Sequence, residues 1–167
     1  MFAAMEVTMA MEGRATFGRE QIRPQHFALV LGIIYTLVGI AGFVPGVLQT
    51  PPPGAPPVRV DQNYGYLFGL FPVNILHTLV HLIVGVWGLL ASRRFAPSRT
   101  YAQSLAVIFG VLTIMGLVPG LNTVFGLIPL FAHDIWLHAL TALVAAYFGW
   151  SRMAAREVFS EERRRAA

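Results

Sequence analysis

The sequence predicts an all-α membrane protein, a bundle of four transmembrane helices built from two tandem helical-hairpin repeats. Three observations lead to this fold class: an apolar composition with few charges, four long apolar segments, and short motifs that occur twice. Apolar residues make up 56% of the 167 residues and charged residues only 12%, about half the share of a typical soluble domain. Such a chain would expose too much apolar surface to water, so we expect the lipid bilayer to be its solvent.

Four apolar segments, each long enough to cross a bilayer, follow one another along the chain. We expect helices over residues 27–44, 73–91, 101–118 and 131–150, which together define a transmembrane domain over residues 26–151. A helix such as the first rises about 27 Å, close to the hydrocarbon thickness of a bilayer. Pro-Gly pairs at 45–46 and 119–120 should end the first and third helices, because Pro-Gly favours a turn.

The longest connection is a proline-rich external loop over residues 45–65. It has five prolines between positions 51 and 57, favours polyproline II and cannot lie exposed in lipid. We interpret it as a spacer in preference to a partner-docking arm. Residues 1–25 contain no continuous apolar run, so we expect no cleavable signal peptide there and a disordered cytoplasmic tail. Residues 152–167 should form a basic cytoplasmic tail.

The arginines predict which side of the membrane each segment occupies. All twelve basic residues are Arg, and eleven of them lie in the two tails or near the turn between the second and third helices. Arg59 alone falls on the opposite side of a four-span bundle. Because cytoplasmic segments carry the excess of Arg, we predict a multi-pass protein of the inner (plasma) membrane with both termini in the cytoplasm. The positive charge is thereby explained without a nucleic acid partner.

Two short motifs recur and indicate an internal duplication. GFVPGV at 42–47 recurs as GLVPGL at 116–121, and GLFP at 69–72 recurs as GLIP at 126–129. Each half is therefore predicted to be a helical hairpin, and the two halves should be related by a pseudo-twofold axis along the membrane normal. We expect Gly85, Gly88 and Gly110 to allow close helix packing. Aromatic residues near the helix ends are interpreted as interfacial: Tyr64, Tyr66, Tyr101, Trp136 and Trp150.

The repeat aligns the four ionisable side chains that fall inside the predicted second and fourth helices. His77 and His81 form an i, i+4 pair, and Asp134 and His138 form the matching pair after the second copy of the motif. Both pairs should lie in the external half, roughly 7 and 13 Å below the helix start. If the inner faces of these helices meet, the four side chains converge.

Three interpretations of this cluster remain open, because an ionisable group at such depth must be neutral, paired or solvated. We prefer a hydrogen-bonded polar core, in which Asp134 accepts from a His of the second helix while other His residues bond carbonyls, Asn74 or Thr78. Asp134 could also cap the fourth helix, and Asn74 should make hydrogen bonds at the start of the second. The alternatives are a transition-metal site of His77, His81, Asp134 and His138, and a haem or chlorophyll-type pigment ligated by His81 or His138.

Catalytic motifs are missing from the sequence. It has no Cys and no Lys, and it contains no phosphate-binding glycine loop, no G-x-S-x-G and no H-E-x-x-H. We therefore expect a small non-enzymatic membrane protein, with an accessory subunit of a larger membrane complex as one form of that role. A metal- or pigment-binding redox or sensor protein is the first alternative, and a small transporter or channel is the second.

The combined pattern resembles a bacterial membrane family catalogued as domain-of-unknown-function family 4383. The resemblance rests on GFVPG after the first helix, GLFPVNILHTLVHLIVGVWGLLA through the second, and GLVPGLNTVFGLIPL with HDIWLHALTA into the fourth. It covers residues 27–150 and implies a four-helix membrane protein with no established reaction. The family-like positions are Asn74, His77, His81, Asn122, Asp134, Trp136 and His138.

Overall fold

The computed structural model describes residues 23–151 and Arg163; the predicted tails otherwise lie outside the described residues. The described part is mostly helical, which confirms the predicted helical class, and its four helices are α2 (Pro24–Ala41), α3 (Ile75–Ala91), α4 (Phe95–Leu117) and α5 (His133–Trp150). Between α2 and α3 lie a short 3-10 helix (Pro45–Val47) and the strands β1 (Leu48–Gln49), β2 (Gly65–Leu67) and β3 (Phe71–Val73).

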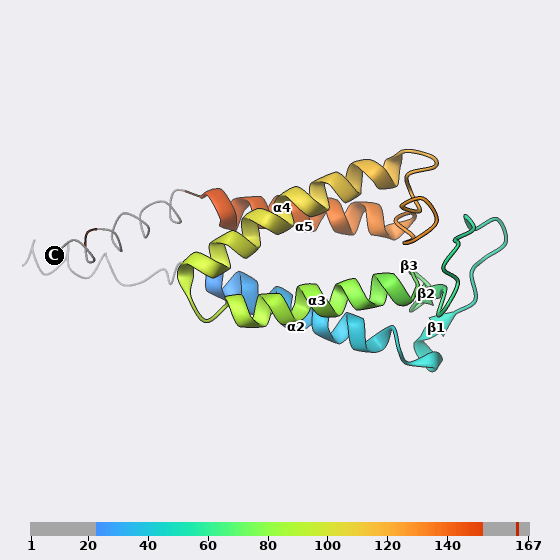
Figure 1. Cartoon of the computed structure of the whole chain (residues 1–167), viewed down its shortest axis with the longest axis horizontal. Helices are drawn as coiled ribbons and strands as arrows, with labels where there is room; N and C mark the ends of the chain where they lie inside the picture. The colour runs from blue at the N-terminus through green and yellow to red at the C-terminus, as the bar shows by residue number, and fades with distance from the viewer. Residues whose placement is uncertain (1–22, 152–162, 164–167) are drawn as a thin grey trace, which may run out of the picture.

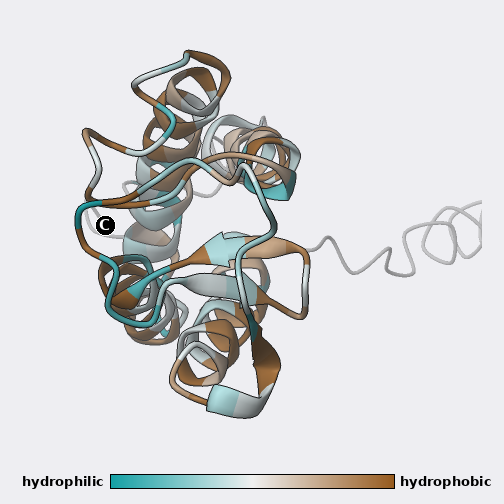
Figure 2. Ribbon diagram, turned by 90° about the vertical axis from the view of Figure 1, so that its right-hand side faces the viewer, coloured by the Kyte–Doolittle hydropathy of each residue, from teal (hydrophilic) through white to brown (hydrophobic). Residues whose placement is uncertain are grey.

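The helices form two antiparallel pairs that lie side by side (Figure 1). Helix α2 packs mainly against α3, and α4 packs mainly against α5, as expected for two hairpins. At one end, which we call the arginine end, lie the start of α2, the α3–α4 turn and the end of α5, with Arg23, Arg93, Arg94 and Arg99. At the other, the sheet end, the strands and the α4–α5 loop cover the helices; viewed from there, these connections stand in front of the bundle (Figure 2).

Helix α4 begins at Phe95, well before the expected start at residue 101. The prediction treated Pro97 and Arg99 as part of the turn, but Pro97 falls in the first helical turn. The backbone N–H groups of a first turn have no partner within the helix, so proline costs little there. Helix α2 likewise begins on Pro24 and ends at Ala41, so that the Pro45–Gly46 pair follows the helix in a 3-10 turn, as the turn interpretation required.

A three-stranded antiparallel sheet in the order β1-β2-β3 was not predicted. Its strands are two or three residues long and lie at both ends of the proline-rich loop. Tyr66 in the central strand pairs with Pro72 in an edge strand, where proline is tolerated because its missing N–H need not join the ladder. Strand β3 leads directly into the start of α3, and the pairing of β1 with β2 holds the two ends of the proline-rich loop close to the helices.

Glycines let α2 and α3 approach closely. A Cβ added to Gly85 would lie 2.5 Å from the backbone nitrogen of Thr36, and one added to Gly88 would lie 2.9 Å from the Ala28 carbonyl oxygen. The packing role predicted for these two glycines is confirmed. The prediction for Gly110 is wrong, because nothing lies within 4 Å of the position its Cβ would take.

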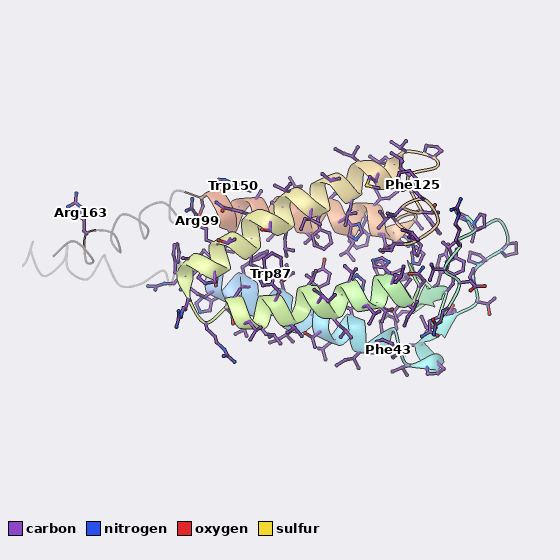
Figure 3. All side chains as sticks on the ribbon, in the orientation of Figure 1. Phe43, Trp87, Arg99, Phe125, Trp150 and Arg163 are labelled. Atoms are coloured by element: carbon purple, nitrogen blue, oxygen red, sulfur yellow. The ribbon has the colours of Figure 1, made fainter. Side chains whose placement is uncertain are left out.

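The half of the bundle next to the arginine end has an apolar core. Tyr101 lies in it, fully buried, with its hydroxyl donating to the Val84 carbonyl at 3.3 Å and its ring edge-on to Trp87 at 5.0 Å. The interfacial interpretation of Tyr101 is therefore wrong, whereas Trp136 and Trp150 are half exposed near helix ends; Figure 3 shows Trp87 inside and Trp150 at the arginine end. The core cluster consists of Phe27, Ala28, Tyr35, Ala91, Tyr101, Ala102, Leu105, Phe109 and Ala145.

Two of the four helices, α2 and α4, are long and apolar enough to cross a membrane. Helix α3 is apolar but only 17 residues long. Helix α5 has 18 residues, but it does not meet the same criterion of length and hydropathy. Its first turns carry His133, Asp134 and His138, which lower its mean hydropathy.

Candidate functional site

Asn74 fixes the start of α3 and therefore the direction of its histidines. Its side-chain oxygen accepts from the His77 backbone N–H at 3.0 Å, which is the standard N-cap arrangement. Its amide group donates to the Val60 carbonyl at 2.8 Å and to the Leu127 carbonyl at 2.7 Å. The predicted role of Asn74 in hydrogen bonding at the helix end is confirmed, and it extends to both loops of the sheet end.

Helix α5 starts without a side-chain cap. The N-cap residue is Ala132, and Asp134 lies in the first turn, so Asp134 does not cap the helix. A carboxylate in this position still interacts favourably with the positive end of the helix dipole. His133 points elsewhere, as predicted: it is exposed, and its Nδ1 accepts from the Trp136 indole N–H at 3.0 Å.

The four predicted site residues converge between α3 and α5. All four are buried, with exposed fractions of 2% for His138, 3% for His77 and Asp134, and 9% for His81. The ring centroids of His77 and His81 are 4.4 Å apart, and those of His77 and His138 are 6.2 Å apart. The His77 Nδ1 atom lies 3.8 Å from the Asp134 carboxylate oxygen. The alignment of the two motif copies thus predicted a real spatial cluster.

The cluster is not a closed hydrogen-bond network. The 3.8 Å between His77 and Asp134 exceeds hydrogen-bond length. In and beside the cluster, five buried polar atoms have no hydrogen-bond partner in the described part of the chain: the Nδ1 atoms of His77, His81 and His138, Thr78 Oγ1 and Asp134 Oδ2. Most buried polar groups in proteins are paired, and each unpaired one costs about 1–3 kcal/mol. The preferred interpretation, a satisfied polar core, therefore describes the contacts only in part.

An apolar cavity of about 300 Å³ adjoins the cluster. It runs along the seam between α2 and α5, and residues of β2, β3 and their connection close its sheet end. Three of the four predicted residues, His81, Asp134 and His138, line it; His77 does not. The other lining residues are apolar or aromatic except Thr141 and the hydroxyl of Tyr35.

Tyr35 and Thr141 belong to this site and were not among the predicted residues. The Tyr35 hydroxyl lies 3.5 Å from Thr141 Oγ1, and this contact joins α2 to α5. The Tyr35 ring also packs on His81 at 5.4 Å. Thr141 follows His138 by three residues, so helical spacing alone places it on the face of Asp134 and His138. That signal was present in the sequence, whereas the approach of Tyr35 depends on tertiary packing.

The geometry gives the metal and pigment hypotheses little support. Among the described residues, no group of three or more His, Cys, Asp or Glu is placed to hold a metal ion. A cavity of 300 Å³ is at the lower end of small-molecule pockets and too small to enclose a tetrapyrrole. The site therefore presents hydrogen-bonding groups that can be electrically neutral at one end of an apolar cavity.

Comparison with known proteins places the chain in a family. No curated protein and no solved structure is similar enough to match it. The family model described as Domain of unknown function (DUF4383) matches residues 25–151, which include every residue of the cluster and all of the four helices except Pro24. The chain therefore belongs to the DUF4383 family, as the resemblance in its motifs predicted.

Proposed function

We propose that this protein is a non-enzymatic, four-span integral protein of the plasma membrane that works by binding through the cluster and cavity in its external half. The observation that carries the proposal is the inverted distribution of side chains. The residues buried between the helices include glycines, histidines, threonines and an aspartate, whereas many large aliphatic residues on all four helices face outward. Such a surface is stable in lipid and unfavourable in water.

The exposed apolar surface also includes α3 and α5, the two helices that do not meet the criterion of length and hydropathy for a membrane span. On α3, Ile83 is 67% exposed and Leu90 is 57% exposed; on α5, Leu143 is 71% exposed. The polar residues that lower the mean hydropathy of α5, Asp134 and His138, are turned inward. With 17 residues, α3 rises about 26 Å, within reach of a bilayer core. These features support four spans.

The described arginines support the orientation. Arg93 and Arg94 are exposed at the arginine end, and Arg59 stands alone at the sheet end. Arg99 is half-buried and donates to the Gly149 carbonyl at 3.1 Å, so it holds α4 to α5 at the arginine end. By the positive-inside rule the arginine end is cytoplasmic, and the cluster and sheet are external. An accessory subunit of a larger complex fits a protein of this size without catalytic motifs.

The packing weighs against a channel or transporter. A hydrated path would have to pass through the half of the bundle next to the arginine end, which Phe27, Tyr101 and Leu105 fill. The cavity is lined by apolar side chains and follows the seam between hairpins, so it opens sideways and not along the bundle axis.

Single-cysteine labelling tests the topology, because the natural chain has no Cys. Pro53→Cys, in the exposed proline-rich loop, should react with an impermeant maleimide in intact spheroplasts. Ala96→Cys, exposed at the start of α4, should react only after lysis. A chain that stays in the supernatant after membranes are pelleted, or a labelling pattern with both sites on one side, refutes the proposal.

A further inference from the structure

The cavity between α2 and α5 is elongated and polar at one end. Phe27 and Val38, at the two ends of its α2 wall, lie about 16 Å apart along the helix axis. By their positions along the helices, His81, Asp134 and His138 lie toward the sheet end, whereas Phe27, Leu31 and Val144 lie toward the arginine end.

The mouth of the cavity lies on the outer surface of the helices. Three of its lining residues are widely exposed: Ile34 at 48%, Leu140 at 51% and Phe68 at 57%. Helices α2 and α5 touch each other little compared with the contacts inside each hairpin. In the proposed topology this seam faces lipid, so a molecule dissolved in the bilayer enters without crossing water.

The unpartnered groups define the chemistry of the ligand. The Nδ1 atoms of His81 and His138 have no hydrogen-bond partner within the described chain, and both side chains line the cavity at less than one-tenth exposure. A neutral imidazole carries one donor and one acceptor. Together with the hydroxyls of Tyr35 and Thr141, these rings suit a polar group that can accept and donate at two separate points.

Charge and shape narrow the choice further. Among the described residues no Arg lines the cavity, whereas the Asp134 carboxyl does, so an anionic head such as a phosphate or a fatty-acid carboxylate is disfavoured. Aromatic walls, including Tyr35 and Phe71, favour a flat ring by stacking and edge contacts.

From this combination we propose that the cavity binds a neutral lipid-soluble quinone or quinol, with its oxygenated ring against His81, His138 and the Tyr35–Thr141 pair and its tail along α2 and α5. The proposal concerns binding and includes no redox step. It rests on the proposed function, since the mouth must open into lipid. It goes beyond that function by naming the class of ligand.

The test uses the full-length protein in phosphatidylcholine nanodiscs, with decyl-ubiquinone and decyl-ubiquinol as probes and decanoic acid and 1-decanol as comparators. Native mass spectrometry measures the one-to-one adduct, and a thermal shift measures stabilisation. We expect saturable one-to-one binding of at least one of the two quinoid probes. Equal or stronger binding of decanoic acid or decanol overturns the proposal, and so does a folded protein that binds none of the four.

Two matched pairs of variants locate the site. Ile34→Trp fills the cavity mouth, whereas Ile33→Trp changes an equally exposed neighbour that does not line it. His138→Leu removes a lining imidazole, whereas His133→Leu removes an exposed one on the same helix. Binding should be abolished in Ile34→Trp and weakened about tenfold in His138→Leu, the cost of one lost hydrogen bond. The two control variants should bind normally.

If Ile34→Trp binds as well as Ile33→Trp, the cavity is not the site. If His138→Leu fails to fold, Ile34→Trp still tests whether the cavity is the binding site, because it changes a half-exposed side chain that faces lipid in the proposed topology. The cysteine labelling separates the two proposals. Failure of labelling removes both, whereas a correctly inserted protein that binds no quinone removes the ligand assignment alone.

Discussion

Replacement of Asn74 by alanine should destabilise the whole sheet end. The Asn74 side chain is fully buried and makes three hydrogen bonds, to the backbone of His77 in α3, to the Val60 carbonyl and to the Leu127 carbonyl. The two carbonyls belong to the two loops of the sheet end, so one amide group joins α3, the proline-rich loop and the α4–α5 loop.

The expected loss can be worked out bond by bond. Loss of the N-cap costs about 1 kcal/mol. The carbonyls of Val60 and Leu127 each lose their donor, which costs about 1 kcal/mol apiece. Asn74→Ala should therefore lower the free energy of unfolding by about 3 kcal/mol, which corresponds to a drop in Tm of roughly 6–12 °C for a domain of this size. Asn74→Ser keeps a good cap and loses only the donors, so it should lose about 2 kcal/mol.

Thermal unfolding in a mild detergent, followed by tryptophan fluorescence, measures both variants. Asn122→Ala is the matched control, because the Asn122 side chain makes no hydrogen bond in the described part of the chain, and its change should stay within about 0.5 kcal/mol. If the Tm of Asn74→Ala equals that of Asn122→Ala, the three hydrogen bonds do not hold the loops to α3, and the reasoning fails. If Asn74→Ser is as unstable as Asn74→Ala, the cap contributes nothing.

Three further predictions use the same assay. Gly85→Ala should lower the free energy of unfolding by about 1–3 kcal/mol, because the added Cβ would lie 2.5 Å from the Thr36 backbone nitrogen. Gly110→Ala has open space around the added Cβ, so its free energy of unfolding should be unchanged or rise by up to about 1 kcal/mol. Equal effects of the two substitutions would contradict the close packing. Ser98→Ala should lower the free energy of unfolding by about 1–2 kcal/mol, because the fully buried hydroxyl donates to the Ala91 and Arg94 carbonyls at 2.8 Å. Ser104→Ala removes no such hydrogen bond, so it should leave the free energy of unfolding unchanged. Arg99→Met and Gln103→Leu should couple by at least about 0.5 kcal/mol in a double-mutant cycle, because both side chains donate to the Gly149 carbonyl; simple additivity would mean that they act separately.

Much of the helical arrangement and of the cluster could be predicted from sequence. Hydropathy located the helices, and the duplicated motif brought the His77/His81 pair together with the Asp134/His138 pair without knowledge of the helix crossing. These inferences succeed because the 3.6-residue period of a helix is a fixed quantity. Asn74 could be assigned because a residue before an apolar helix has a narrow range of roles.

The remaining features depend on tertiary contacts that no local pattern carries. The strands are too short to show an alternation, and Pro72 argues against a strand unless it is known to lie at an edge. Gly110 and Gly85 look alike in sequence, but only Gly85 meets a neighbouring backbone. The cavity requires Tyr35 of α2 to reach Thr141 of α5, a contact between residues far apart in the chain.

The three bonds of Asn74 also imply an order of events during synthesis. Once α2, the proline-rich loop and α3 have emerged, Asn74 can cap α3 and reach Val60, but the carbonyl of Leu127 has not yet been made. At that stage the His77 and His81 pair on α3 also lacks α5 as a neighbour. In the proposed membrane topology, the first hairpin therefore waits in the bilayer with its polar face uncovered until the second hairpin packs against it. In that topology, chains whose synthesis stops early keep this polar face exposed to lipid, a feature that membrane quality control can recognise.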